Sequence, residues 1–260
     1  MLLVIDAGNT NIVFALYDGK DKRGSWRIAT DAQRTADQYA VWLNSVMALK
    51  GLKAGAISCA IIGSVVPDAT FNLQRLCIDH LEATPLIIGR DKLDYGIDIH
   101  MDRPEEVGAD RILNAVAAFE RYGGPAIVID FGTATTFDIV GADGSYSGGI
   151  IAPAAGHSLD ALHRIAAKLP RVDIAKPESV IGKSTVSGMQ SGIYWGYVSL
   201  IEGLVKRIQL EYGATMRVIA TGGLAPMFAG STDAIDDVDP DLTLRGLVLV
   251  YQRNAHLCAA

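Results

Sequence analysis

The chain has 260 residues and a mass of 27.6 kDa, and 50% of its residues are hydrophobic, so it can form two domains of ordinary size with sizeable cores. Its formal charge of -6 comes without a basic stretch, which argues against a nucleic-acid partner and favours small-molecule ligands. Three scattered cysteines lack the spacing of a disulfide framework or a zinc site. No apolar run approaches the ~20 residues that span a bilayer. We therefore expect a cytoplasmic protein that does not enter a membrane.

Two stretches of the chain share one pattern. Residues 2–18 read LLVIDAGNTNIVFALYD, and residues 126–140 read AIVIDFGTATTFDIV. Each is an apolar, β-branched run that ends in Asp, followed by Gly, a polar cluster and a second apolar run, which predicts a β-hairpin with a polar tip. The carboxylate and the turn amides could bind Mg²⁺ and phosphate oxygens, or the polar residues could simply satisfy the turn. The repetition favours a ligand-binding device used twice.

The segment after the first hairpin alternates strands and helices. We predict a strand over 24–29, a helix over 35–50 that begins at Thr35, and a buried strand over 56–66. A helix over 68–81, capped by Asp68, and a short strand over 85–88 follow. Three strands and then helix, strand, helix, strand is the order that one half of a ribonuclease H-like domain requires.

Residues 98–124 contain a third candidate site. From Arg111 to Phe119 apolar residues recur at helical spacing and two glycines follow, so Asp110 would lie in the first turn of a helix. The helix dipole stabilises a carboxylate there, and Arg111 could clamp a carboxylate or phosphate. Asp110 is therefore a candidate general base and Arg111 a candidate substrate anchor. Plain helix capping by Asp110 is the alternative.

The C-terminal half continues the alternation after a turn at Asp143 and Gly144. We predict helices over 159–168 and 186–209, a strand over 216–220, an acidic loop over 233–241 and a closing helix over 244–254. The helix over 186–209 carries a broad apolar and aromatic stripe that predicts core packing but would also suit a dimer interface. After the strand, Gly222 and Gly223 would let a planar group such as adenine lie against the backbone.

The sequence IGKST at 181–185 invites a P-loop interpretation, which we reject. A P-loop needs a Gly five residues before its Gly-Lys pair, and that position holds Pro177. No clear strand leads into the segment either. Phosphate binding is therefore expected at the two hairpin tips.

Four motifs together resemble the type III pantothenate kinase family. They are DAGNTN at 6–11, GADR at 108–111, DFGTAT at 130–135 and TGGL at 221–224, and the resemblance covers nearly the whole chain. It implies an α/β fold with two ribonuclease H-like domains, each a mixed sheet flanked by helices, of the acetate and sugar kinase, Hsp70 and actin superfamily. We expect one domain over 1–120 and the other over 121–260, with the last helix packing back on the first. The family also implies a homodimer.

The resemblance implies ATP-dependent phosphorylation of pantothenate to 4'-phosphopantothenate, the first step of coenzyme A biosynthesis. By this resemblance Asp110 accepts the proton of the pantothenate hydroxyl, Asp6 lies near Mg²⁺, and Asp130 binds a monovalent cation, K⁺ or NH₄⁺. The substrate-binding positions are Gly108, Ala109, Asp110, Arg111, Thr185 and Met101. The ATP-binding positions are Asp6, Ala7, Gly8, Asn9, Thr10, Asn11, Ile12, Val13, Thr133, Gly222 and Gly223.

Three residues depart from the family pattern. Met101 stands where a Tyr is frequent and so lacks a hydroxyl contact to substrate, Ala154 stands where a Gly is common, and Gly188 stands where Ala is usual. None of the three departures touches a residue that is expected to carry charge in the site, so we expect an active kinase.

Three alternatives were weighed. GADR argues against another sugar or acetate kinase. The presence of Asp6 and Asp110 argues against a catalytically idle homologue that acts as a transcriptional accessory protein. An Hsp70-like ATPase would be expected to carry a peptide-binding domain as well.

Overall fold

The computed structural model describes residues 1–165 and 169–258. The chain forms two compact units: unit 1 comprises Met1–Ala117 together with Asp241–Ala260, and unit 2 comprises Ala118–Pro240. The division falls inside a helix, three residues before the boundary expected from the sequence. The last helix, α7 (Leu242–Asn254), belongs to unit 1.

Unit 1 is built on a five-stranded sheet with the order β3-β2-β1-β4-β5. Strands β1 and β2, and β2 and β3, pair antiparallel, whereas β4 pairs parallel with β1 and β5 parallel with β4. The strands are β1 (Leu2–Ala7), β2 (Asn11–Asp18), β3 (Asp21–Ala29), β4 (Cys59–Ser64) and β5 (Pro85–Ile87). The α-helices are α1 (Ala36–Ala48), α2 (Pro67–Arg75), the first part of α3 (Ala109–Tyr122) and α7, and the shorter helical turns are Ala54–Ala56, Leu76–His80, Pro104–Glu106 and Ala255–Leu257.

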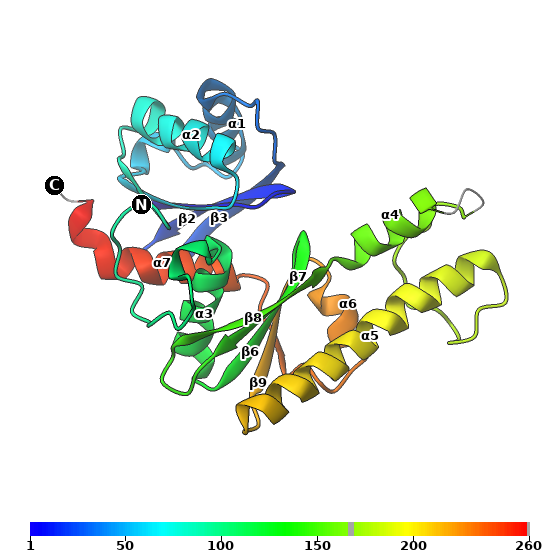
Figure 1. The fold of residues 1–260 in the computed structure, drawn as a ribbon. Coiled ribbons are helices and arrows are strands. Elements are labelled where there is room, and N and C mark those ends of the chain that lie inside the picture. The colour runs from blue at the N-terminus through cyan, green and yellow to red at the C-terminus, as the bar shows by residue number, and fades with distance from the viewer. Residues whose placement is uncertain (166–168, 259–260) are drawn as a thin grey trace. The chain divides into compact units, whose positions relative to one another are not determined.

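Both faces of the unit 1 sheet are covered by helices, because alternate side chains of a strand point to opposite faces (Figure 1). In β1, Leu3 and Ile5 pack in a cluster with α1 and α2. Leu2 and Val4 pack in a second cluster with α3 and α7. The capping box at Thr35 starts α1: the Thr35 hydroxyl accepts from the Gln38 amide, and the Gln38 side chain accepts from the Thr35 amide.

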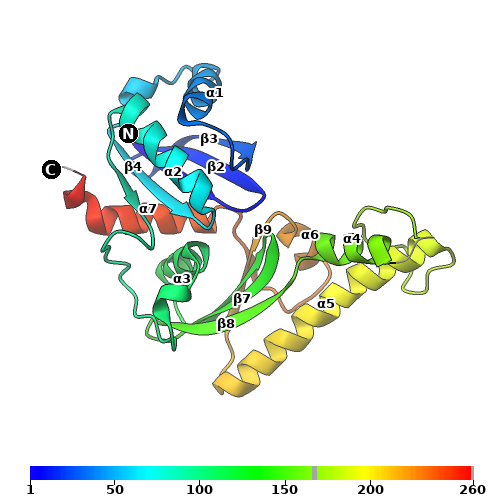
Figure 2. The same cartoon turned by 45° about the horizontal axis from the view of Figure 1, so that its top comes forward.

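Unit 2 repeats the sheet with the order β10-β9-β6-β7-β8. Read from the antiparallel edge, β8-β7-β6-β9-β10 matches β3-β2-β1-β4-β5 in direction as well as in order. The strands are β6 (Ala126–Phe131), β7 (Ala134–Val140), β8 (Tyr146–Pro153), β9 (Arg217–Gly222) and β10 (Asp237–Val238), and the helices are α4 (Ala155–Ile165), α5 (Thr185–Tyr212) and α6 (Ala225–Ala229). Helices α5 and α6 lie along one face of the sheet, and α4 extends beyond the sheet beside α5 (Figure 2). Ile127, Ile129 and Phe131 pack with apolar side chains of these helices in one core.

Most predicted elements are present, and five predictions need correction. Helix α2 begins with Pro67 at its first position, and Asp68 lies inside the first turn without capping it. The predicted continuation of that helix to 81 is a π-helical turn, Leu76–His80. Strand β8 fills a stretch for which we predicted no strand, and the acidic loop over 233–241 contains β10. The predicted helix over 159–168 instead begins at Ala155, and its residues 166–168 lie outside the described part of the chain.

Candidate active site

The tip of the first hairpin is a tight, exposed turn. The amide of Gly8 donates to the carbonyl of Asn11 at 3.0 Å, and Asn9, Thr10 and Asn11 are exposed. A residue that the sequence analysis did not single out also contacts this turn. Thr30, directly after β3, donates its hydroxyl to the Gly8 carbonyl at 2.6 Å and its amide to the Thr10 carbonyl at 3.0 Å. The antiparallel order of β1, β2 and β3 was the signal that could have identified it.

Asp6 lies at the carboxyl end of β1, opposite Val13 of β2 and Gly63 of β4. It follows Leu2 and Val4 at a spacing of two, so its side chain is on the sheet face that α3 and α7 cover. The carboxylate is half-buried, as is expected of an oxygen ligand that a strand holds in place.

Asp110 lies in the first turn of α3, on the same side of the sheet as Asp6. Its carboxylate accepts from the Arg111 amide at 2.9 Å. Burial raises the pKa of the Asp110 carboxyl above its ordinary value, and this hydrogen bond and the Arg111 charge oppose the rise in part. A Cβ at Gly108 would come within 2.6 Å of an Asp110 oxygen, so a larger residue at position 108 would make the carboxylate shift.

Asp130, near the end of β6, is the counterpart in unit 2 of Asp6 in β1. It pairs with Thr136 of β7 and Thr221 of β9. Two glycines lie near its side chain: Gly222, predicted to bind ATP, and Gly132, in the turn of the second hairpin. A Cβ at Gly222 would come within 2.7 Å of an Asp130 oxygen, and one at Gly132 within 3.6 Å. Gly222 also has a φ of +88°, which favours glycine. The structure thus places Asp130 beside Gly222, whereas the sequence alone assigned them separately.

Four other predicted residues lie at exposed positions, whereas Ala7, Ile12 and Ala109 are buried. Thr133 is exposed in the turn after β6, and Gly223 follows β9. Thr185 is the first residue of α5, which begins at a capping box formed by Ser184 and Ser187. Met101 is 37% exposed in the long connection between β5 and α3. In the described residues before α5 no strand runs into the IGKST segment, as a P-loop would require.

Asp6 and Asp130, the two carboxylates at strand ends, could each give one ligand to a cation whose other ligands are water or substrate oxygens. Within residues 1–165 and 169–258 no cluster of three or more His, Cys, Asp and Glu could hold a metal ion by itself. Mg²⁺ commonly takes one or two carboxylates and completes its shell with water and substrate phosphates. Asp6 fits that role. Asp130 is the strand-end carboxylate of unit 2 that could hold a monovalent cation.

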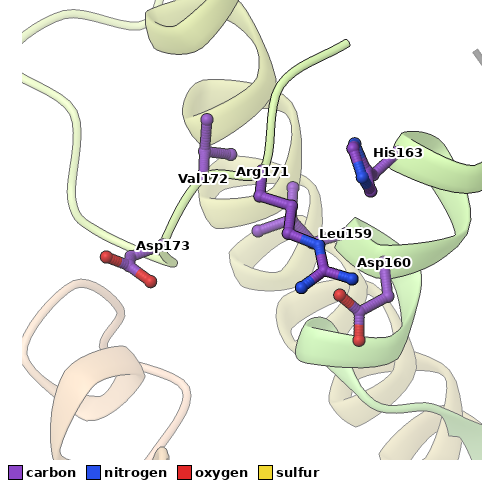
Figure 3. Close-up of a pocket in the computed structure, with 6 residues that line it drawn as sticks. All are labelled: Leu159, Asp160, His163, Arg171, Val172 and Asp173. Atoms are coloured by element: carbon purple, nitrogen blue, oxygen red, sulfur yellow. The ribbon is translucent and has the colours of Figure 1, made fainter. Parts of the chain in front are cut away.

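A separate polar pocket of 210 Å³ lies in unit 2 (Figure 3). Leu159, Asp160 and His163 of α4 face Arg171, Val172 and Asp173, and none of the predicted site residues lines it. The guanidinium of Arg171 points toward Asp160 (Figure 3).

In the described part of the chain, no helix is both long enough and apolar enough to cross a membrane.

Two sheets of one topology, each with a carboxylate at a hairpin tip, define the duplicated ribonuclease H-like fold of actin-like ATPases and related kinases. A crystal structure of component A of (R)-2-hydroxyglutaryl-CoA dehydratase from Acidaminococcus fermentans has this fold, with a TM-score of 0.57, 16% identity and 98% of each chain covered. A ROK hexokinase from Thermus thermophilus superposes with a TM-score of 0.51 and 12% identity over 98% of this chain and 99% of its own. The predicted fold class is confirmed.

Sequence comparison identifies the family within this class. The family model described as type III pantothenate kinase matches residues 2–207. A protein of Rhodospirillum rubrum named type III pantothenate kinase is 61% identical over 254 residues, which cover 98% of this chain and 99% of that protein. The chain belongs to the type III pantothenate kinase family, a family of phosphotransferases, and the resemblance seen in the four motifs is confirmed.

Proposed function

We propose that this protein phosphorylates pantothenate with ATP, giving 4'-phosphopantothenate and ADP, the first step of coenzyme A biosynthesis. The observation that carries the proposal is the Asp110 carboxylate, held against Gly108 at the start of α3 in a chain that belongs to this family. Asp110 accepts the proton as the substrate hydroxyl attacks the terminal phosphorus of ATP. Arg111 anchors the pantothenate carboxylate.

The raised pKa of Asp110 supports its role as a base. A carboxylate whose pKa lies above its ordinary value is a stronger proton acceptor than a free Asp. The Arg111 amide fixes one of its oxygens and leaves the other for the substrate hydroxyl. Gly108, Ala109, Thr185 and Met101 complete the substrate contacts in this proposal.

Both hairpin tips contribute contacts to ATP in this proposal. Exposed backbone amides and hydroxyls at residues 8–11 and at Thr133 are donors for phosphate oxygens, and the glycines at 222 and 223 leave room for adenine. Asp6 would hold Mg²⁺ and Asp130 a K⁺ or NH₄⁺ ion. When bound, these cations neutralise phosphate charge, which is the main requirement of phosphoryl transfer through a loose transition state.

We also propose that the protein is a homodimer that uses an exposed surface of unit 2. Ile165, Val180 and Ile181 are more than 60% exposed, at 85%, 64% and 79%. Gly188, Gly192 and Gly196 form an exposed row along α5, and among the described residues no neighbouring atom lies within 4 Å of a Cβ added at any of them. Glycine inside a helix costs about 0.5–1 kcal/mol relative to Ala, so such a row is favoured where a second chain must approach closely.

The test is pantothenate-dependent release of ADP from Mg·ATP, measured with and without K⁺ or NH₄⁺. For Asp110→Asn we expect kcat to fall about 10²–10⁴-fold, as for the loss of a general base. Asp68→Asn, which makes the same change at an exposed first-turn position of α2, should keep wild-type turnover. A folded wild type that is silent under every cation condition would contradict the kinase proposal and favour a regulatory role.

A further inference from the structure

The hydrogen bonds of Thr30 fix the orientation of the phosphate-binding turn of unit 1. Its hydroxyl bonds the Gly8 carbonyl at 2.6 Å, and its amide bonds the Thr10 carbonyl at 3.0 Å, so one residue holds two carbonyls of the turn, which Asn9 separates. The Thr30 side chain is half-buried, whereas Asn9, Thr10 and Asn11 are exposed. Thr30 thus supports the turn from the protein side.

Because the peptide bond is planar, these contacts also determine where the neighbouring backbone N–H groups point. In a trans peptide the C=O and the following N–H point in opposite directions. Because the Gly8 and Thr10 carbonyls point toward Thr30, the amides of Asn9 and Asn11 point away from it. Backbone amides that point to the same side of a turn can donate to an anion there.

We infer that Thr30 is a positioning residue for ATP: it holds the turn so that the Asn9 and Asn11 amides face the phosphates. This inference rests on the proposed function, because it concerns the same ATP site. The amide bond to the Thr10 carbonyl comes from the backbone and survives any substitution except Pro. The hydroxyl bond to Gly8 is therefore the part that a side-chain variant removes.

The test compares Thr30→Val with Thr30→Ser. Val keeps the branched shape and the backbone bond but loses the hydroxyl, so we expect KM and Kd for Mg·ATP to rise about five- to tenfold, as for one lost hydrogen bond. KM for pantothenate should stay within about twofold of wild type, and Ser should restore most of the ATP affinity. Equal ATP affinity in Val and wild type, or no recovery in Ser, would overturn the inference.

Ser45→Ala is the matched control. It also removes a hydroxyl that donates to a backbone carbonyl, that of Val41 at 2.7 Å, but at an exposed position of α1 in the same unit. Its KM for Mg·ATP should match wild type even if its thermal stability falls. A rise equal to that of Thr30→Val would mean that the effect is general loosening of unit 1.

Two measurements keep this test separate from that of the kinase proposal. Isothermal titration with Mg·ATP in the absence of pantothenate reports ATP affinity without turnover, so an inactive wild type that binds ATP would refute the kinase proposal alone. The second measurement is hydrogen exchange of the backbone amides in the wild-type protein, which needs no variant. Mg·ATP should slow the exchange of the amides at residues 9–11, and unchanged exchange at saturating Mg·ATP would overturn the role of Thr30.

Discussion

At Asp110 the protein holds a carboxylate where its charge is disfavoured. Because burial raises the pKa above the unfolded value of about 3.9, the native state binds this proton more tightly than the unfolded state. Unfolding therefore releases the proton between the two pKa values, and stability falls as pH rises through that window and stays lower above it.

Asp110→Asn should therefore unfold at a higher urea concentration than wild type at pH 7.5, and the difference should shrink toward pH 4. Urea unfolding of both proteins at the two pH values measures this. A variant that is less stable than wild type at pH 7.5 would contradict the expectation. The same measurement shows whether its loss of turnover occurs in folded protein.

Gly108 provides a second prediction at this scale. In Gly108→Ala the new Cβ would displace the Asp110 carboxylate, since the two would be 2.6 Å apart. A displacement of about 1 Å can cost about 10²-fold in rate, so we expect kcat to fall by that order while ATP affinity is retained. Gly156→Ala in α4, where a Cβ meets no atom within 4 Å among the described residues, is the control and should keep wild-type kcat. Wild-type kcat in Gly108→Ala would show that the carboxylate adapts.

Among the elements, helix α5 offers the clearest test of the proposed homodimer. If its glycine row is the dimer contact, Gly192→Leu places a bulky side chain in the interface and should convert the dimer to folded monomer, as measured by light scattering after size exclusion. Asn44→Leu adds the same side chain at an exposed position of α1 in unit 1 and should leave the mass unchanged. A Gly192→Leu protein that stays dimeric would move the interface away from this row.

The elements also show where sequence patterns are sufficient and where they are not. Both hairpins could be predicted because their first strands, β1 and β6, are central in their sheets and form continuous apolar runs. Strand β8 is an edge strand with alternating exposure, so it lacks such a run and contains Gly148 and Gly149. The start of α2 was misassigned because Asp68 suggested a cap, whereas Pro67 at the first helical position is the stronger signal.

For the candidate site, the motifs single out individual residues but do not show which of them are neighbours. The contact of Asp130 with Gly222 depends on the parallel pairing of β6 with β9, whose residues are about ninety positions apart in the chain. Thr30 likewise becomes visible only when β3 is paired with β2 and its next residue meets the turn. Single-sequence patterns carry local information, and these contacts are not local.

At the scale of the whole molecule, the duplication is unequal in one respect. The two sheets share one topology, but the chain returns after unit 2 to complete unit 1 with α7. Leu244, Leu247, Val248 and Val250 of α7 are buried in the cluster that also contains Val4 of β1. Unit 1 therefore depends on the most distant part of the sequence for part of the core on one face of its sheet.

A chain that ends at Pro240 tests this dependence. Fully burying four such side chains contributes about 6–12 kcal/mol, which is comparable to the whole stability of a typical domain, so unit 1 should unfold without α7. Hydrogen exchange should then lose protection in β1, β2 and β4 and keep it in β6, β7 and β9, whose core lies within unit 2. A chain that ends at Leu257 retains α7 and should keep both sets protected. Protection of β1 and β4 in the shorter chain would mean that α1 and α2 alone stabilise the first sheet.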